Sequence, residues 1–65
     1  MRLKMKEIRE EKNLTQEEMA KLILTSRSNY ANIELGNSNP SFDLSLRIKK
    51  VLQNKNDDIF INTNV

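Results

Sequence analysis

Two helix start signals lie close together in residues 14–40, and their spacing restricts the fold more than any other feature of the sequence. Thr15 is followed three residues later by Glu18, which is the pattern of a capping box. Ser26 is a favourable N-cap for the next helix, and Gly36 suits the left-handed position that often ends one. Two helices of about two turns each, joined by a turn of about three to four residues, predict a helix-turn-helix unit.

The second helix of this unit has an apolar side and a small, polar side. At about 100° per residue, Tyr30 and Ile33 fall on the apolar side. The opposite side and the N-terminus of the helix carry four small or polar residues: Arg27, Ser28, Ala31 and Asn32. Arginine, asparagine and an alanine methyl group suit guanine, adenine and thymine in the DNA major groove. Such residues are often plain helix surface, but the preceding helix and turn favour base readout here.

Four segments cover nearly the whole chain in a characteristic order and spacing: MKEIREEKNLTQEEMAKL, SRSNYANIELGNSNPS, LRIKKVL and DDIF. Through these segments the chain resembles the Cro/cI (XRE) family of bacterial and phage helix-turn-helix regulators. The resemblance implies one all-α domain over residues 1–65, a five-helix lambda-repressor-like DNA-binding fold in which the second and third helices form the helix-turn-helix. It also implies a transcriptional regulator that binds double-stranded DNA and is not an enzyme.

The family pattern gives roles to particular positions. The base-reading positions of the third helix correspond to Arg27, Ser28 and Asn32, to which we add Ala31. The expected phosphate contacts lie at the start of the second helix, at the cap of the third and in the segment after it: Gln16, Ser26, Asn37, Ser38 and Asn39. A helix N-terminus favours a phosphate at Gln16, although a solvated first-turn residue is the alternative. The internal ion pair between helices one and three corresponds to Arg9 and Glu34, and a phosphate contact by Arg9 is the other reading.

Two positions in the turn between the second and third helices depart from the family pattern. Leu24 stands where the family usually has glycine. The backbone there must avoid a positive φ or accept a cost of about 1 kcal/mol or more. Thr25 stands where the family usually has a buried valine, and it adds a hydroxyl group. Both departures affect the angle between the two helices rather than a DNA contact.

The residues around the helix-turn-helix are predicted to form a scaffold of three further helices. The first spans about residues 4–12, and Asn13 suits the left-handed residue that follows it. The fourth begins after Ser41 and runs to about Gln53. The segment 57–60 resembles the short fifth helix of the family, whose apolar residues close the core.

Two features of the scaffold leave alternatives open. Phe42 and Leu46 lie on a different side of the fourth helix from its main apolar stripe, so they belong either to the core or to a dimer contact. The ending 60–65 is rich in β-formers and could pair with residues 1–4 as two short strands. A frayed tail is the alternative for this ending.

Composition excludes several classes of protein. The chain has no cysteine and no histidine, so we expect no disulfide, no metal site and no histidine-based catalysis. No stretch approaches the roughly 20 apolar residues of a membrane span, and the N-terminus lacks a signal-peptide core. We therefore expect a cytoplasmic protein without a cofactor or a membrane partner. The net charge of +2 is only weak support for nucleic-acid binding.

The leading hypothesis is a transcriptional regulator, a repressor, that binds an inverted-repeat operator as a homodimer. We expect no second domain, so control would come from protein concentration, promoter competition, or a separate antirepressor or regulatory protein. The alternative is an antitoxin-type protein-interaction module that also binds its own promoter, which predicts a hydrophobic or disordered arm. An RNA-binding adaptor would need exposed aromatic residues, and the chain has only one tyrosine and two phenylalanines.

Overall fold

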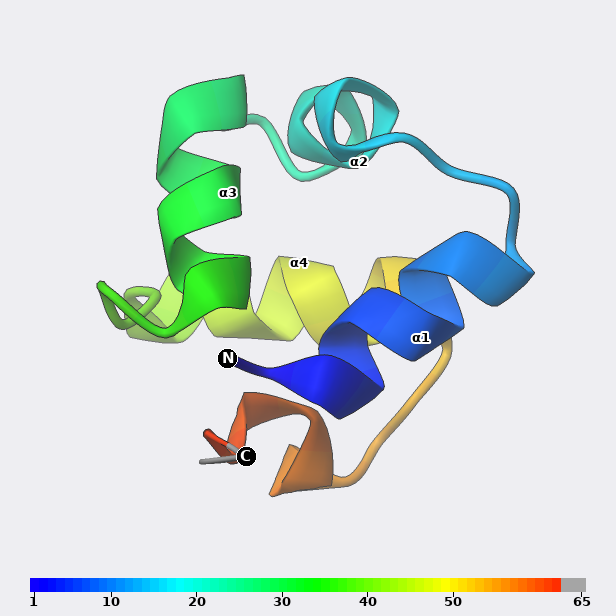
Figure 1. Ribbon diagram of the computed structural model, residues 1–65, viewed down its shortest axis with the longest axis vertical. Coiled ribbons are helices and arrows are strands. Elements are labelled where there is room, and N and C mark those ends of the chain that lie inside the picture. The colour runs from blue at the N-terminus through cyan, green and yellow to red at the C-terminus, as the bar shows by residue number, and fades with distance from the viewer. Residues whose placement is uncertain (63–65) are drawn as a thin grey trace.

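A computed structural model of the chain describes residues 1–62, and Figure 1 shows its arrangement of helices. The four α-helices are α1 (Leu3–Glu11), α2 (Gln16–Leu22), α3 (Arg27–Leu35) and α4 (Phe42–Leu52). A 3-10 turn, η1 (Asp57–Phe60), follows them. In Figure 1, α3 stands at one edge of the molecule, α2 packs against it, and α4 crosses below. The described residues are thus all-helical, as predicted.

The last helix and the strand pair differ from the prediction. The segment 57–60 forms one 3-10 turn in place of an α-helix, and four residues are the usual length of such a turn. The strand predicted for residues 1–4 is wrong, since Leu3 and Lys4 already belong to α1. The backbone N–H of Arg2 donates to the Glu34 carbonyl at 2.8 Å, which fixes the chain just before this helix. The opposite strand is also absent over residues 60–62, and residues 63–65 lie outside the described part of the chain.

The predicted capping residues lie at the observed helix ends. Thr15 Oγ1 accepts the Glu18 N–H at 3.1 Å, and Glu18 Oε1 accepts the Thr15 N–H at 2.9 Å, which completes the capping box. Ser26 and Ser41 each accept the backbone N–H of the residue three positions later. Gly36 ends α3 with a left-handed φ of 86°, as its position predicted. Local sequence signals therefore set where these helices begin and end.

The core gathers apolar side chains from all four helices and η1. Its buried members are Met5, Met19, Ala20, Ile23, Tyr30, Ile33, Leu44, Ile48, Leu52 and Ile59. Phe42 and Leu46 lie outside it and remain 77% and 48% exposed, so they are not core residues. None of the helices in residues 1–62 is long and apolar enough to cross a membrane.

Two lysines pair with the aspartates of η1 at the surface. Lys4 Nζ lies 2.6 Å from Asp58 Oδ2, and Lys49 pairs with Asp57. Both pairs are at least partly exposed, and such pairs contribute about 1 kcal/mol or less. The full burial of Ile59 is therefore the main reason that η1 stays against the core.

Candidate nucleic-acid interface

The turn between α2 and α3 contains the two departures from the family pattern. Leu24 has a φ of 61° and is 78% exposed, so the backbone accepts the cost of the left-handed conformation. The Thr25 hydroxyl accepts a hydrogen bond from Asn29 Nδ2 at 2.8 Å, so this added polar group has a partner. Arg47 Nε of α4 donates to the Ile23 carbonyl at 2.9 Å. The turn is thereby tied to the scaffold on its inner side.

The outward side of α3 carries the residues predicted to read bases. Tyr30, Ile33 and Glu34 are buried and face the inside of the protein. The predicted base-reading residues are exposed or, for the alanine, half-buried: Arg27, Ser28, Ala31 and Asn32. One helix surface therefore presents a guanidinium, a hydroxyl, an amide and a methyl group together. Figure 1 shows that α3 lies at the edge of the molecule, and the exposure of Arg27, Ser28 and Asn32 makes this surface accessible.

Arg9 and Glu34 form a buried ion pair beneath this helix. Arg9 Nε lies 2.8 Å from Glu34 Oε2, and Nη2 lies 3.0 Å from Oε1, so the contact is bidentate. The two residues are 7% and 1% exposed. Arg9 Nη1 also donates to the Leu14 carbonyl at 2.6 Å, and Gln16 Nε2 donates to Glu34 Oε1 at 3.2 Å. This network joins α1, α2 and α3.

The ion pair shifts the pKa values of its members. Desolvation alone would raise the pKa of Glu34, but the hydrogen bonds from Arg9 and Gln16 help to lower it below its ordinary value of 4.5. The hydrogen bond to Glu34 raises the pKa of Arg9. Burial, and then the neighbouring Glu34 carboxylate, raise the pKa of the Tyr30 hydroxyl. Glu34 is therefore held as a carboxylate that neutralises Arg9.

Arg2 forms a second buried polar cluster that the sequence reasoning missed. Its side chain donates four hydrogen bonds, to Phe60 O at 3.0 Å, Ile33 O at 2.5 Å, Ser38 O at 2.9 Å and Asn39 Oδ1 at 2.7 Å. The residue is only 3% exposed, and desolvation lowers its pKa. These contacts place a cation at the C-terminus of α3, where free carbonyl groups favour positive charge. The only sequence signal was a basic residue just before the first helix.

The residues predicted to contact phosphates near α2 and the α3 cap already have protein partners. Gln16 lies at the N-terminus of α2, half-buried, and one of its two amide hydrogens points to Glu34. Ser26 Oγ accepts the Asn29 N–H at 3.0 Å, and its hydroxyl hydrogen stays free for another acceptor. A phosphate contact at either residue stays a prediction.

The loop after α3 carries the other predicted phosphate contacts. Asn37 and Asn39 are exposed, whereas Ser38 Oγ is buried and has no hydrogen-bond partner within residues 1–62. The backbone N–H groups of Asn37 and Ser38 both donate to the Asn32 carbonyl, at 2.9 and 3.3 Å. Those two backbone donors are therefore occupied. The exposed side-chain donors of residues 37–39 are the two asparagine amides.

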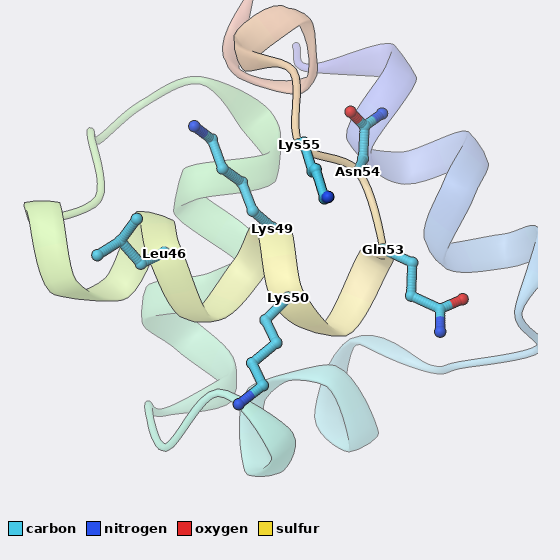
Figure 2. A pocket seen from close by; sticks show the side chains of 6 residues that line it. All are labelled: Leu46, Lys49, Lys50, Gln53, Asn54 and Lys55. Carbon is cyan, nitrogen blue, oxygen red and sulfur yellow. The ribbon is translucent and has the colours of Figure 1, made fainter.

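A groove of about 540 Å³ lies on the outer surface of α4 and the segment after it. Figure 2 shows the six residues that line it: Leu46, Lys49, Lys50, Gln53, Asn54 and Lys55. Lys49 and Lys50 extend in different directions from α4 in this view. None of the residues predicted to contact DNA lines the groove, so it is separate from the α3 surface.

Comparisons with known proteins agree with this architecture. The helix-turn-helix domain family matches residues 4–59. Two proteins of Archaeoglobus fulgidus, both described as uncharacterized HTH-type transcriptional regulators, are 43% and 36% identical to the chain over 61 residues. These alignments cover 94% of this chain and 86% and 87% of the two relatives. No solved structure matches the chain significantly.

A third relative bears on the origin of the chain. An uncharacterized HTH-type transcriptional regulator of Methanocaldococcus jannaschii is 43% identical over 61 residues, which cover 94% of this chain and 92% of that protein. These relatives are archaeal, so they do not support the bacterial or phage origin that the resemblance suggested. The family match and the relatives together show that the chain belongs to the XRE-type family of helix-turn-helix transcriptional regulators.

Proposed function

We propose that this protein binds specific sequences of duplex DNA through α3 and represses transcription from the sites it occupies. The observation that carries the proposal is the outward side of α3, where Arg27, Ser28 and Asn32 are exposed while the opposite side is buried. A helix fits the major groove, and each base pair presents a distinct pattern of donors and acceptors there. The relatives described as transcriptional regulators support the same function.

Each reading residue has a base that suits its chemistry. The Arg27 guanidinium can donate two hydrogen bonds to guanine, and the Asn32 amide can both donate to and accept from adenine. The Ala31 methyl group suits contact with the thymine methyl, and Ser28 can pair with several bases. Phosphate contacts from Gln16 and the asparagines of the loop 37–39 would set the register of α3 without reading sequence.

Binding as a homodimer to an inverted repeat is part of the proposal. One good bidentate contact supplies only about 1–3 kcal/mol of discrimination, so one reading helix distinguishes few sites. Two copies on half-sites about one helical turn apart would multiply the specificity. The exposed Phe42 and Leu46 side chains on α4 support a surface for self-association. A bound dimer would exclude RNA polymerase, and an antirepressor or other regulatory protein would relieve the repression.

Selection from a random duplex library, followed by sedimentation, tests this function. We expect the protein to enrich an inverted repeat, and the selected duplex to sediment with two protein chains. A complex of one chain with a non-palindromic site would contradict the dimer, and failure to enrich any sequence would contradict the proposed function itself.

A further inference from the structure

Arg2 connects the end of α3 to the loop that follows it. Its guanidinium donates to Ser38 O at 2.9 Å and to Asn39 Oδ1 at 2.7 Å. The same group holds Ile33 O at 2.5 Å and Phe60 O at 3.0 Å, so it is fixed from several sides. At 3% exposure, Arg2 itself is too buried to touch a large ligand. Its effect on the surface must therefore pass through the groups that it holds.

The contact with Arg2 fixes which end of the Asn39 amide faces inward. A guanidinium has five N–H donors and no acceptor, so the atom of Asn39 that faces it has to be the oxygen. Nδ2 with its two hydrogens is then the end of the amide that has no partner within residues 1–62, and Asn39 is exposed. An unconstrained asparagine can present either end, but this one presents only a donor.

A fixed donor at this place suits a phosphate group. Phosphate oxygens accept hydrogen bonds and, when fully ionised, do not donate them. The neighbouring backbone donors of Asn37 and Ser38 are already taken by the Asn32 carbonyl. The cationic Arg2 also polarises the Asn39 amide and adds positive potential behind the loop.

We infer that Arg2 is a positioning residue for DNA binding, which turns the Asn39 amide so that its N–H donors face a backbone phosphate. This inference rests on the proposed function, since it requires that the loop 37–39 lies along DNA. Asn37 provides a matched comparison, because it is exposed in the same loop and its side chain makes no hydrogen bond within residues 1–62. Of these two asparagines, only Asn39 has the orientation of its amide set by Arg2.

A scan of single neutral methylphosphonate linkages in the selected duplex tests the inference. The parent protein should bind about tenfold more weakly when the phosphate at Asn39 is neutralised, because the Asn39 amide then faces a neutral group in place of an ionised acceptor. Asn39→Asp keeps an acceptor for Arg2 but replaces the donor with a negative charge. This variant should melt at or above the temperature of the parent, and neutralising the same phosphate should strengthen its binding. Asn37→Asp is the control, and it should keep the loss seen for the parent at that linkage.

The role of Arg2 itself is measured with Arg2→Gln, whose amide can hold Asn39 in either orientation. We expect the loss at the Asn39 linkage to be smaller for this variant than for the parent, although Asn39 is intact. Whatever the stability of Arg2→Gln, the inference is overturned if this variant keeps the parent's full loss at the Asn39 linkage. It is also overturned if Asn39→Asp melts well below the parent or keeps the parent's loss at that linkage. Absence of any duplex binding by the parent would overturn the proposed function as well, so the two failures are distinguishable.

Discussion

Two buried arginines hold α3 in place by different physical means. Arg9 faces the Glu34 carboxylate, and this hydrogen bond raises the pKa of the arginine. Arg2 faces three backbone carbonyls and one amide oxygen, and its burial without a carboxylate lowers its pKa. The first contact is an ion pair between side chains, whereas the second is a cation placed among neutral dipoles.

Both arginines act on the same half of α3. Arg9 binds the Glu34 side chain, and Arg2 binds the Ile33 carbonyl one residue earlier. The N-terminal half of the helix, with Arg27 and Ser28, is exposed. A small domain can thus fix the direction of a helix from its C-terminal half while its N-terminal half stays accessible. We call the contact of Arg9 with Glu34 and the contacts of Arg2 the two anchors of α3, and we expect the loss of each to affect stability differently.

The largest expected effect is the loss of one member of the ion pair. Arg9→Met leaves the Glu34 carboxylate uncompensated at 1% exposure, which should cost about 3–5 kcal/mol. This amounts to much of the roughly 3–10 kcal/mol expected for a domain of this size. Arg9→Met combined with Glu34→Leu should recover most of the loss, because an apolar pair can replace a buried ion pair. Denaturant unfolding measures the stability of both variants. A double variant no more stable than Arg9→Met would show that the uncompensated Glu34 charge is not the cause of the loss.

Removal of Arg2 should have a smaller effect that no second substitution repairs. Arg2→Met removes the donors of four hydrogen bonds but leaves only neutral acceptors, which should cost about 2–3 kcal/mol. Adding Asn39→Leu should not restore stability, since the other three acceptors are backbone carbonyls. The same unfolding measurement applies. Recovery of the parent's stability by this double variant would show that the two anchors are alike.

Acid should weaken the Arg9–Glu34 anchor and not the Arg2 anchor. The pKa of Glu34 is lowered in the folded protein, so its contribution to stability is complete above the ordinary value of 4.5. That contribution is lost as the pH falls through the lower folded-state pKa. Thermal melts at decreasing pH should therefore drop more steeply for the parent than for Arg9→Met with Glu34→Leu. The hydrogen bond from the Thr15 N–H lowers the pKa of Glu18 in both proteins and so does not distinguish them. Parallel curves would therefore contradict a charged Glu34 in the native state.

The smallest expected effect lies at the turn before α3. Leu24 adopts a left-handed φ of 61° and is 78% exposed, so its side chain contributes little packing. Leu24→Gly should relieve this strain and stabilise the protein by up to about 1 kcal/mol after the entropy of glycine in the unfolded state is counted. Leu24→Ala is the matched control, which keeps the β-carbon and should give no such gain. Equal melting temperatures for the glycine and alanine variants would show that the turn is not strained.

The sequence predicted those parts of the fold that depend on neighbouring residues. Thr15, Ser26 and Ser41 cap their helices through contacts three residues away, so a local pattern is sufficient to locate them. The exposed side of α3 was predictable for the same reason, because helical periodicity alone separates it from Tyr30 and Ile33. The contact between Arg9 and Glu34 needed the family resemblance, since the two residues lie far apart in the sequence.

Contacts between side chains and distant backbone could not be predicted in this way. Three of the four acceptors of Arg2 are carbonyl groups, and every residue carries one, so no residue type marks the partner. The strand expected for residues 1–4 was wrong for a related reason. Arg2 is the N-cap of α1, and its backbone N–H donates to the Glu34 carbonyl. Only the folded chain brings this carbonyl near the N-terminus. The burial of the Ser38 hydroxyl likewise depends on tertiary packing.

The central claim is that the accessible side of α3 reads bases while residues outside it only position the helix. Competition binding against single-base variants of the selected duplex tests this most directly. We predict that Arg27→Ala and Asn32→Ala each relax the preference at particular base pairs, by about 1–3 kcal/mol. Gln16→Ala should weaken binding to all of the duplexes about equally, because a phosphate contact carries no sequence information. A changed base preference in Gln16→Ala, with an unchanged preference in both α3 variants, would contradict the account.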